Sequence, residues 1–242
     1  MPERNHASWV LETNGKLYFF DAGEGCSKTA HLAGLDLLAT HAIVISHPHM
    51  DHVGGLTNLL WTIRKLTRRY KRTPLFDCLH VYLSCMDTWD GIVRILRNTE
   101  GNFASSYPME AVAIQKGLLF DDGTVRVTAF PNTHIAPQNG VALSYSFLIE
   151  CEGRRVVYSG DIKSYSELDC MIDNGCDVLI GETGHHTIDD VYGYATTKSI
   201  GKVYFTHHGR EILNDLAAAS AKVSKLFGTR AAIAFDGMTV EA

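Results

Sequence analysis

The chain has 242 residues, of which 45% are hydrophobic and 20% are charged, and its formal net charge is −5. This composition excludes intrinsically disordered and fibrous proteins, and the length is sufficient for a sizeable hydrophobic core. The negative net charge gives no general attraction for nucleic acid, although a local basic patch is compatible with it. The chain contains 12 histidines, which is many for this length and points to a metal site.

The first part of the chain is predicted to open with a hairpin and then to alternate helices and strands. Residues 8–13 and 16–21 are strand-like, and Asn14-Gly15 between them is a strong hairpin turn. Apolar residues at helical spacing predict a long helix over 53–70. The other elements expected here are helix 27–39, strand 42–46, strand 79–83 and helix 87–97.

A strand-rich block follows, and the last third of the chain alternates helices and strands again. The strand-like runs of the block are 111–115, 124–130, 142–150 and 154–160. After Asp161 we expect helices 166–173, 189–199 and 211–227 and strands 177–181, 202–206 and 231–235. No internal repeat or linker is visible, so residues 1–242 are expected to form one α/β domain in which two sheets pack together with helices outside.

The cysteines and the opening residues indicate the compartment. None of the six cysteines (Cys26, Cys78, Cys85, Cys151, Cys170, Cys176) belongs to a C-x-x-C pair, and most lie in or beside apolar segments. Buried, reduced thiols are therefore favoured over a disulfide framework. No signal peptide is visible, and no apolar run reaches the roughly 18 residues of a membrane span. We expect a soluble, cytoplasmic protein with no membrane partner.

A basic cluster lies at the end of the predicted long helix; it consists of Arg64, Lys65, Arg68, Arg69, Lys71 and Arg72. Its simplest interpretation is a solvated helix face, because cations are favourable near a helix C-terminus. The alternative is a docking patch for an anionic or nucleotide substrate.

The strongest functional signal is the H-x-H-x-D-H motif formed by His47, His49, Asp51 and His52, directly after an apolar strand. His47 and His49 lie two apart on an extended segment, so their rings project to one side and can hold one ion. Asp51 and His52 lie where the loop turns into the next helix and can face a second ion. A histidine-rich loop or one structural metal is the alternative, but closed structural zinc sites usually contain cysteine and none is nearby.

Three later strand ends supply further candidate ligands. His134 follows strand 124–130, Asp161 follows strand 154–158, and two histidines, His207 and His208, follow strand 203–206. Each of these alone is a weak signal, because a single loop histidine usually only makes a hydrogen bond. Loops at strand ends often carry functional residues. Because four strand ends each supply a candidate ligand, we expect these residues to belong to a common two-metal site.

These motifs, in this order, resemble the metallo-β-lactamase superfamily, and within it the ribonuclease Z and cyclic phosphodiesterase group. The resemblance covers nearly the whole chain, from the Asp21 loop to Phe235-Asp236-Gly237-Met238. It implies a four-layer αββα sandwich with a dinuclear site at one rim. Members of the group usually place a strand and a Gly-rich turn before the stretch with which this sequence opens. Either that first edge strand is lacking here, or the native start lies upstream.

The resemblance also implies a role for each candidate residue. It assigns His47, His49 and His134 to one ion and Asp51, His52 and His207 to the other, with Asp161 bridging; His208 is the alternative to His207. Asp21-Ala22-Gly23-Glu24-Gly25 is similar to the Asp-Cys-Gly-Glu-Gly loop of the group, and Gly184-His185-His186-Thr187 to its Gly-His-Ser-Thr stretch. There the histidine acts on the leaving group beside an acid, which implies His185 with Glu182, or His186 instead. The catalytic residues are thus expected to be Asp51, His185 and Glu182.

We therefore expect a metal-dependent hydrolase, a phosphodiesterase in which two divalent ions share a bridging hydroxide. Zinc is the first expectation, and manganese or iron would suit the same ligands. The expected substrate is a small anionic or nucleotide phosphodiester. Processing of tRNA is not expected, because ribonuclease Z carries its tRNA-gripping arm where this chain has only residues 135–160.

Three points stay open at this stage. The same site would suit a thioester or lactone hydrolase, which is the alternative within enzymes. A metal-binding, redox or sensor protein without hydrolytic activity is the alternative of another class. Many relatives are dimers, so a homodimer is compatible with the resemblance.

Overall fold

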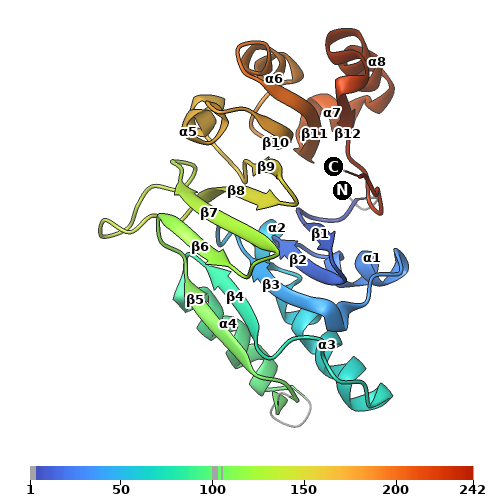
Figure 1. Ribbon diagram of the computed structural model, residues 1–242, viewed down its shortest axis with the longest axis vertical. Coiled ribbons are helices and arrows are strands. Elements are labelled where there is room, and N and C mark those ends of the chain that lie inside the picture. The colour runs from blue at the N-terminus through green and yellow to red at the C-terminus, as the bar shows by residue number, and fades with distance from the viewer. Residues whose placement is uncertain (1–3, 100–102, 105, 242) are drawn as a thin grey trace. The chain divides into compact units, whose positions relative to one another are not determined.

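The computed structural model describes residues 4–99, 103, 104 and 106–241 (Figure 1). The chain divides into two compact units, Met1–Ile114 and Gln115–Ala242. Each unit contains one mixed β-sheet flanked by helices, as the α/β prediction requires. Within the described residues no helix combines the length and the apolar character needed to cross a bilayer.

The sheet of the first unit has five strands in the order β1-β2-β3-β4-β5. Their bounds are β1 Trp9–Thr13, β2 Lys16–Phe20, β3 Thr40–Val44, β4 Leu79–Leu83 and β5 Met109–Ala113. The first two strands are antiparallel and the other neighbours are parallel. Asn14 and Gly15 both have positive φ, at 50° and 72°, which is the backbone that a two-residue hairpin requires. The predicted hairpin is confirmed.

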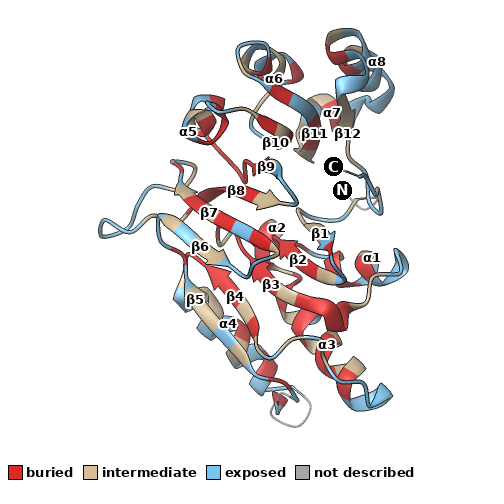
Figure 2. Cartoon of the chain, in the orientation of Figure 1, coloured by how far each residue is buried: buried red, intermediate tan, exposed pale blue. Residues whose placement is uncertain are grey.

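The helices of the first unit are α1 Cys26–Leu32, α2 Met50–Val53, α3 Leu56–Tyr70 and α4 Met86–Arg97, with the short 3-10 helix η1 at Leu37–Ala39. Helix α3 buries one stripe of apolar side chains, among them Leu59 and Ile63, in one cluster with Phe19, Ile43 and Val81 of the sheet. Figure 2 shows buried and exposed residues alternating along α3, while β3 is mostly buried. The helix predicted over 27–39 is wrong in its second half. Gly34 has a φ of 83°, and this left-handed backbone ends the helix.

The second unit has a sheet of seven strands in the order β12-β11-β10-β9-β8-β7-β6. The bounds are β6 Gly117–Asp121, β7 Val125–Pro131, β8 Tyr145–Cys151, β9 Arg154–Tyr158, β10 Cys176–Thr183, β11 Ile200–His208 and β12 Ala231–Ile233. Strands β6 to β9 pair antiparallel and β9 to β12 parallel. Strand β6 was not expected from the sequence, because its side chains are only partly buried and give no clear alternation.

The helices of this unit are α5 Asp169–Ile172, α6 Ile188–Ala195, α7 Arg210–Asn214 and α8 Leu216–Phe227, with 3-10 turns η3 at Tyr165–Leu168 and η4 at Gly228–Arg230. Helix α6 starts with a capping box in which Thr187 and Asp190 bond each other's backbone N–H. The single helix predicted over 211–227 is wrong. Asp215 interrupts it and its side chain accepts a 2.9 Å hydrogen bond from Ala218 N, which starts α8 as a separate helix.

Two expectations about side-chain burial need correction. All six cysteines are free, but only Cys26 and Cys176 are buried, and Cys170 is exposed. In the basic cluster, Arg64 is buried and stacks on Phe103 instead of facing solvent. Its Nε also donates to the Ala104 carbonyl at 3.1 Å, so this arginine packs a loop onto α3.

The aromatic side chain of Phe205 tests the packing of the second unit. Phe205 is fully buried on β11 and packs edge-on against Phe227 of α8. Phe205→Ala is expected to lower the free energy of unfolding by about 3–5 kcal/mol, measured by urea denaturation. Leu118→Ala is the control, because Leu118 on β6 is exposed, and its effect should stay within about 0.5 kcal/mol. Equal effects of the two changes would contradict this packing.

Candidate metal centre

The first group of candidate ligands lies in the loop between β3 and α3 and is organised by the carboxylate of Asp21. Asp21 follows β2, is fully buried and has a φ of 59°. Its Oδ1 accepts from Ser46 N at 2.6 Å, and its Oδ2 accepts from Ser46 Oγ at 2.8 Å. The Nδ1 of His52 lies 2.7 Å from the same Oδ2. One carboxylate therefore ties the end of β2 to the end of β3 and to α2.

This hydrogen bond decides which nitrogen of His52 can bind a metal. A carboxylate is an acceptor, so the Nδ1 of His52 carries the proton and its Nε2 presents a lone pair. The carboxylate oxygen Oδ2 of Asp51 lies 3.8 Å from that Nε2. The two residues thus offer one nitrogen and one oxygen close together.

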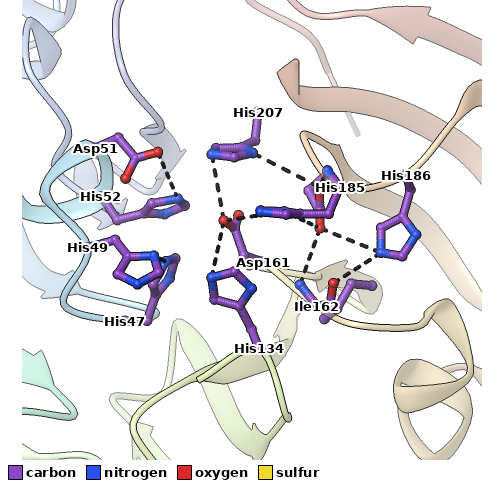
Figure 3. Close-up of polar contacts among 12 residues, drawn as sticks. His47, His49, Asp51, His52, His134, Asp161, Ile162, His185, His186 and His207 are labelled. Atoms are coloured by element: carbon purple, nitrogen blue, oxygen red, sulfur yellow. Dashed lines mark hydrogen bonds and ion pairs between the residues drawn. The ribbon is translucent and has the colours of Figure 1, made fainter. Parts of the chain in front are cut away.

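His47 and His49 form a second pair in the same loop (Figure 3). The Nε2 of His47 lies 3.1 Å from the Nδ1 of His49, as expected for two residues on one side of an extended segment. The other ring nitrogen of His47, Nδ1, lies 3.0 Å from Ser46 Oγ. Ser46 therefore links the rings of His47 and His52 to the Asp21 carboxylate, which sets both orientations.

Two glycines allow the Asp21 loop to lie against the ligand loop. A Cβ at Gly23 would overlap the carbonyl oxygen of Asp51, and a Cβ at Gly55 would overlap the carbonyl oxygen of Gly23. The close approach is held by backbone hydrogen bonds of 2.8 Å from Ala22 N to His52 O and from Gly55 N to Ala22 O. These positions explain why glycines surround the motif.

The second group of candidate ligands lies at strand ends of the second unit and surrounds Asp161. This carboxylate follows β9 and is 2% exposed. Its Oδ2 lies 3.7 Å from His134 Nε2, just past the end of β7, and 3.6 Å from His207 Nε2 on β11 (Figure 3). One oxygen is therefore near two imidazole nitrogens from different strands, as a bridging ligand would be.

The backbone of His207 favours this histidine over its neighbour. His207 has a φ of 44°, a left-handed conformation that non-glycine residues rarely adopt. A Cβ at Gly184 would overlap the Nδ1 of the His207 ring, so only glycine leaves room for it. The next residue, His208, uses its Nε2 in a 2.8 Å hydrogen bond with the Ala234 carbonyl. Of the two alternatives, His207 is the one that lies beside Asp161.

His185 and Glu182 form the remaining part of this cluster. The Nδ1 of His185 lies 3.1 Å from Glu182 Oε1, and the backbone N–H of His185 donates to Oε2 at 2.9 Å. Glu182 is 1% exposed, whereas the His185 side chain is 46% exposed. His186 is more buried, and its Nε2 bonds the Ile162 carbonyl at 3.0 Å. His185 is therefore the histidine whose ring combines an acidic partner with access to solvent.

The spacing of these groups fits divalent cations. Ligands about 2.0–2.2 Å from a tetrahedral ion lie about 3.4 Å from each other. The pairs His47–His49 and Asp51–His52 in the first unit have separations of 3.1 and 3.8 Å. In the second unit, the predicted ligands His134 and His207 have their Nε2 atoms 3.7 and 3.6 Å from the Oδ2 of Asp161. Each unit thus brings its own predicted ligands together, and the donor set of imidazole and carboxylate suits zinc, manganese or iron.

Asp21 and Ser46 were not among the candidate site residues from the sequence, although their hydrogen bonds orient two of the histidines. A single acidic residue after a strand has no fixed sequence spacing to the other candidate ligands, so a spacing motif does not identify Asp21. The only indication was its place in the Asp-Ala-Gly-Glu-Gly loop. In the interval between His134 and Asp161, the structure contains a short connection and then β8 and β9, so no arm of the ribonuclease Z kind is present there.

Gly184→Ala tests the placement of the His207 ring. The added methyl group would force the ring or the backbone to shift, and we expect a loss of about 1–3 kcal/mol in the free energy of unfolding, measured by urea denaturation. Gly193→Ala in α6 is the matched control, because open space surrounds Gly193. There alanine should leave stability unchanged or raise it by up to about 1 kcal/mol. A neutral Gly184→Ala would show that the ring does not lie against Gly184.

Comparison with curated proteins finds ribonucleases Z. That of Bradyrhizobium sp. (strain ORS 278) is 22% identical over 295 residues, which cover 98% of this chain and 95% of the relative. That of Bradyrhizobium diazoefficiens is 26% identical over 153 residues, 63% of this chain and 46% of the relative. The chain thus spans less than half the length of the second relative.

Comparison with solved structures identifies the fold. Human tRNase Z, short form, has a TM-score of 0.70 at 20% identity, covering 100% of this chain and 94% of that chain. The metallo-beta-lactamase fold protein YhfI from Bacillus subtilis has the same TM-score at 17% identity and the same coverage. Zinc-bound PqqB from Methylobacterium extorquens has a TM-score of 0.64 at 15% identity, covering 98% and 87% of the two chains.

The family model described as "Anti-Pycsar protein Apyc1" matches residues 2–219, which is most of the chain. Together with the structural matches, this confirms the expected superfamily. The chain is a metallo-β-lactamase-fold protein related to ribonuclease Z, and it belongs to the Anti-Pycsar Apyc1 family.

Proposed function

We propose that this protein is a two-metal phosphodiesterase that opens cyclic nucleotides. The observation that supports the proposal is the His185–Glu182 pair beside Asp161, because a histidine with an acidic partner next to a candidate metal ligand is suited to give a proton to a leaving group. The family supports the substrate class, since the Apyc1 protein for which it is named degrades cyclic nucleotides. The short interval between His134 and Asp161 also favours a small substrate over tRNA.

The metal ions would be held by the residues that the sequence motifs predict. His47, His49 and His134 would bind one ion, and Asp51, His52 and His207 the other, with Asp161 shared by both. Zinc suits these ligands, and manganese or iron are the alternatives. When bound, two such ions activate water at neutral pH and stabilise the negative charge that develops on the phosphoryl group.

Asp51, besides its proposed role as a ligand, and the remaining site residues would position and move protons. Water adds to phosphorus while the bond from phosphorus to the leaving oxygen breaks, and Asp51 takes the proton that the water loses. The Nε2 of His185 donates a proton to the leaving oxygen, and the product of a cyclic substrate is a linear nucleotide. Glu182 holds the Nδ1–H of His185 and stabilises the charged ring before the transfer. Asp21 and Ser46 keep the rings of His47 and His52 in their ligand orientations.

Metal dependence and substrate class are tested together with purified protein reconstituted separately with zinc and manganese. We expect hydrolysis of cyclic nucleotides by a reconstituted form, loss of activity with a chelator, and recovery when the metal is restored. A thioester, a lactone and a precursor tRNA belong in the same panel. Turnover of the thioester or lactone alone would establish the acyl hydrolase instead, and a fully active chelated protein would exclude the metal mechanism.

The role of His185 is tested by His185→Ala. We expect kcat for a cyclic nucleotide to fall by about 10²- to 10⁴-fold, because the leaving oxygen no longer receives a proton. The bound metal content should not change, and a nitrophenyl phosphodiester, whose leaving group needs no proton, should lose much less activity. His186→Ala is the comparison, with activity expected to remain. If instead His186→Ala abolished turnover and His185→Ala did not, the donor would be His186.

A further inference from the structure

A second group of metal-ligand side chains lies in the first unit on the neighbouring strands β4 and β5. The parallel register of these strands pairs His80 directly with Glu110. Cys78 precedes β4 and stands two positions before His80, so the alternation of side chains places it on the same face. None of these three residues has a role in the proposed phosphodiesterase site.

The distances among the three side chains fit one cation. The Nε2 of His80 lies 3.7 Å from Glu110 Oε2, and the Sγ of Cys78 lies within 4.8 Å of both ligand atoms. Ligands on a tetrahedral zinc ion, with bonds of about 2.0–2.3 Å, are about 3.3–3.8 Å apart, so only small side-chain movements would bring all three onto one ion. The hydrogen-bonded pairing of β4 with β5 fixes the Cα positions of His80 and Glu110, and Cys78 directly precedes β4.

Exposure and charge also suit a cation site. The side chains of His80 and Glu110 are 39% and 65% exposed, so an ion can reach them and can keep a water molecule as a fourth ligand. Burial and the nearby Glu110 carboxylate raise the pKa of the Cys78 thiol. The Cys78 thiolate and the Glu110 carboxylate would repel each other, and a divalent cation bound between them would offset this repulsion by attracting both.

We propose that Cys78, His80 and Glu110 form a separate zinc-type site at the edge of the five-stranded sheet. Binding releases the thiol proton of Cys78 to solvent and leaves the sulfur as a thiolate ligand. Because β5 is the last strand in the order of this sheet, the ion would fasten it to β4. This site would be distinct from the proposed catalytic ions in ligand chemistry, since those ions have only nitrogen and oxygen ligands.

Cobalt titration of the metal-free 242-residue chain tests the proposal through that difference. Cobalt bound by a thiolate gives a charge-transfer absorption band in the near ultraviolet, which nitrogen and oxygen ligands do not give. We expect the band in the unmodified chain and its loss in Cys78→Ser. Cys170→Ser is the matched control, because Cys170 is an exposed cysteine of the second unit and the band should persist. Added zinc should displace cobalt and remove the band.

The other two ligands are tested by His80→Ala and Glu110→Gln, each of which should weaken cobalt binding by about tenfold or more in the same titration. A missing band in the unmodified chain, or a band that persists in Cys78→Ser, would overturn the proposal. Circular dichroism of each variant shows that the fold is kept. Cyclic-nucleotide hydrolysis by Cys78→Ser should equal that of the unmodified chain, so failure of this site and failure of the proposed phosphodiesterase are distinguishable.

Discussion

The buried carboxylate of Asp21 is the constraint on which the ligand loop of the first unit depends. An ionised carboxylate without partners is very unfavourable in a protein interior, so the chain must bring donors to it. Ser46 supplies a backbone N–H and a hydroxyl, and His52 supplies the Nδ1–H. Hydrogen bonds to a charged group contribute about 1.5–3 kcal/mol each, more than the neutral bonds that hold most loops. The need to pair the Asp21 carboxylate therefore holds together the ends of β2 and β3 and helix α2. It also places the proton of the His52 ring on Nδ1.

Both units have strained backbone at the ends of strands. Asp21 after β2 and His207 on β11 have φ values of 59° and 44°, and neither is glycine. Such conformations cost about 1–3 kcal/mol each and persist where surrounding contacts enforce them, which is often at functional sites. The compensation is visible in both cases. Asp21 has its charged hydrogen bonds, and the His207 ring occupies space that Gly184 leaves open.

How much of this structure follows from the sequence depends on whether a feature is local. The Asn14-Gly15 hairpin and the grouping of His47 with His49 were predictable, because turn chemistry and side-chain alternation act over two residues. Strand β6 was not, because its residues are partly buried and give no period-two pattern.

Long-range roles were the least accessible from the sequence. The contact of Asp21 with Ser46 joins positions 25 residues apart, and no spacing rule relates them. The buried Arg64 is a similar case: it lies in a run of basic residues that reads as a solvated face, and only its contacts with Phe103 and Ala104 show otherwise. Family resemblance pointed to the Asp21 loop, but the chemical reason for the acid appears only in its partners.

The short connection between β10 and α6 has a consequence for the proposed proton donor. Glu182 lies near the end of β10, and His185 follows three residues later, so the carboxylate and the proposed proton donor are parts of one turn. The two oxygens of Glu182 hold the backbone N–H and the ring Nδ1 of the same residue. The buried Glu182 thus orients both the backbone and the ring of His185. Because the ring is already held, little conformational entropy is lost when a substrate binds. A donor built in this way needs no distant loop to position it, and this suits a chain whose connections around the site are short.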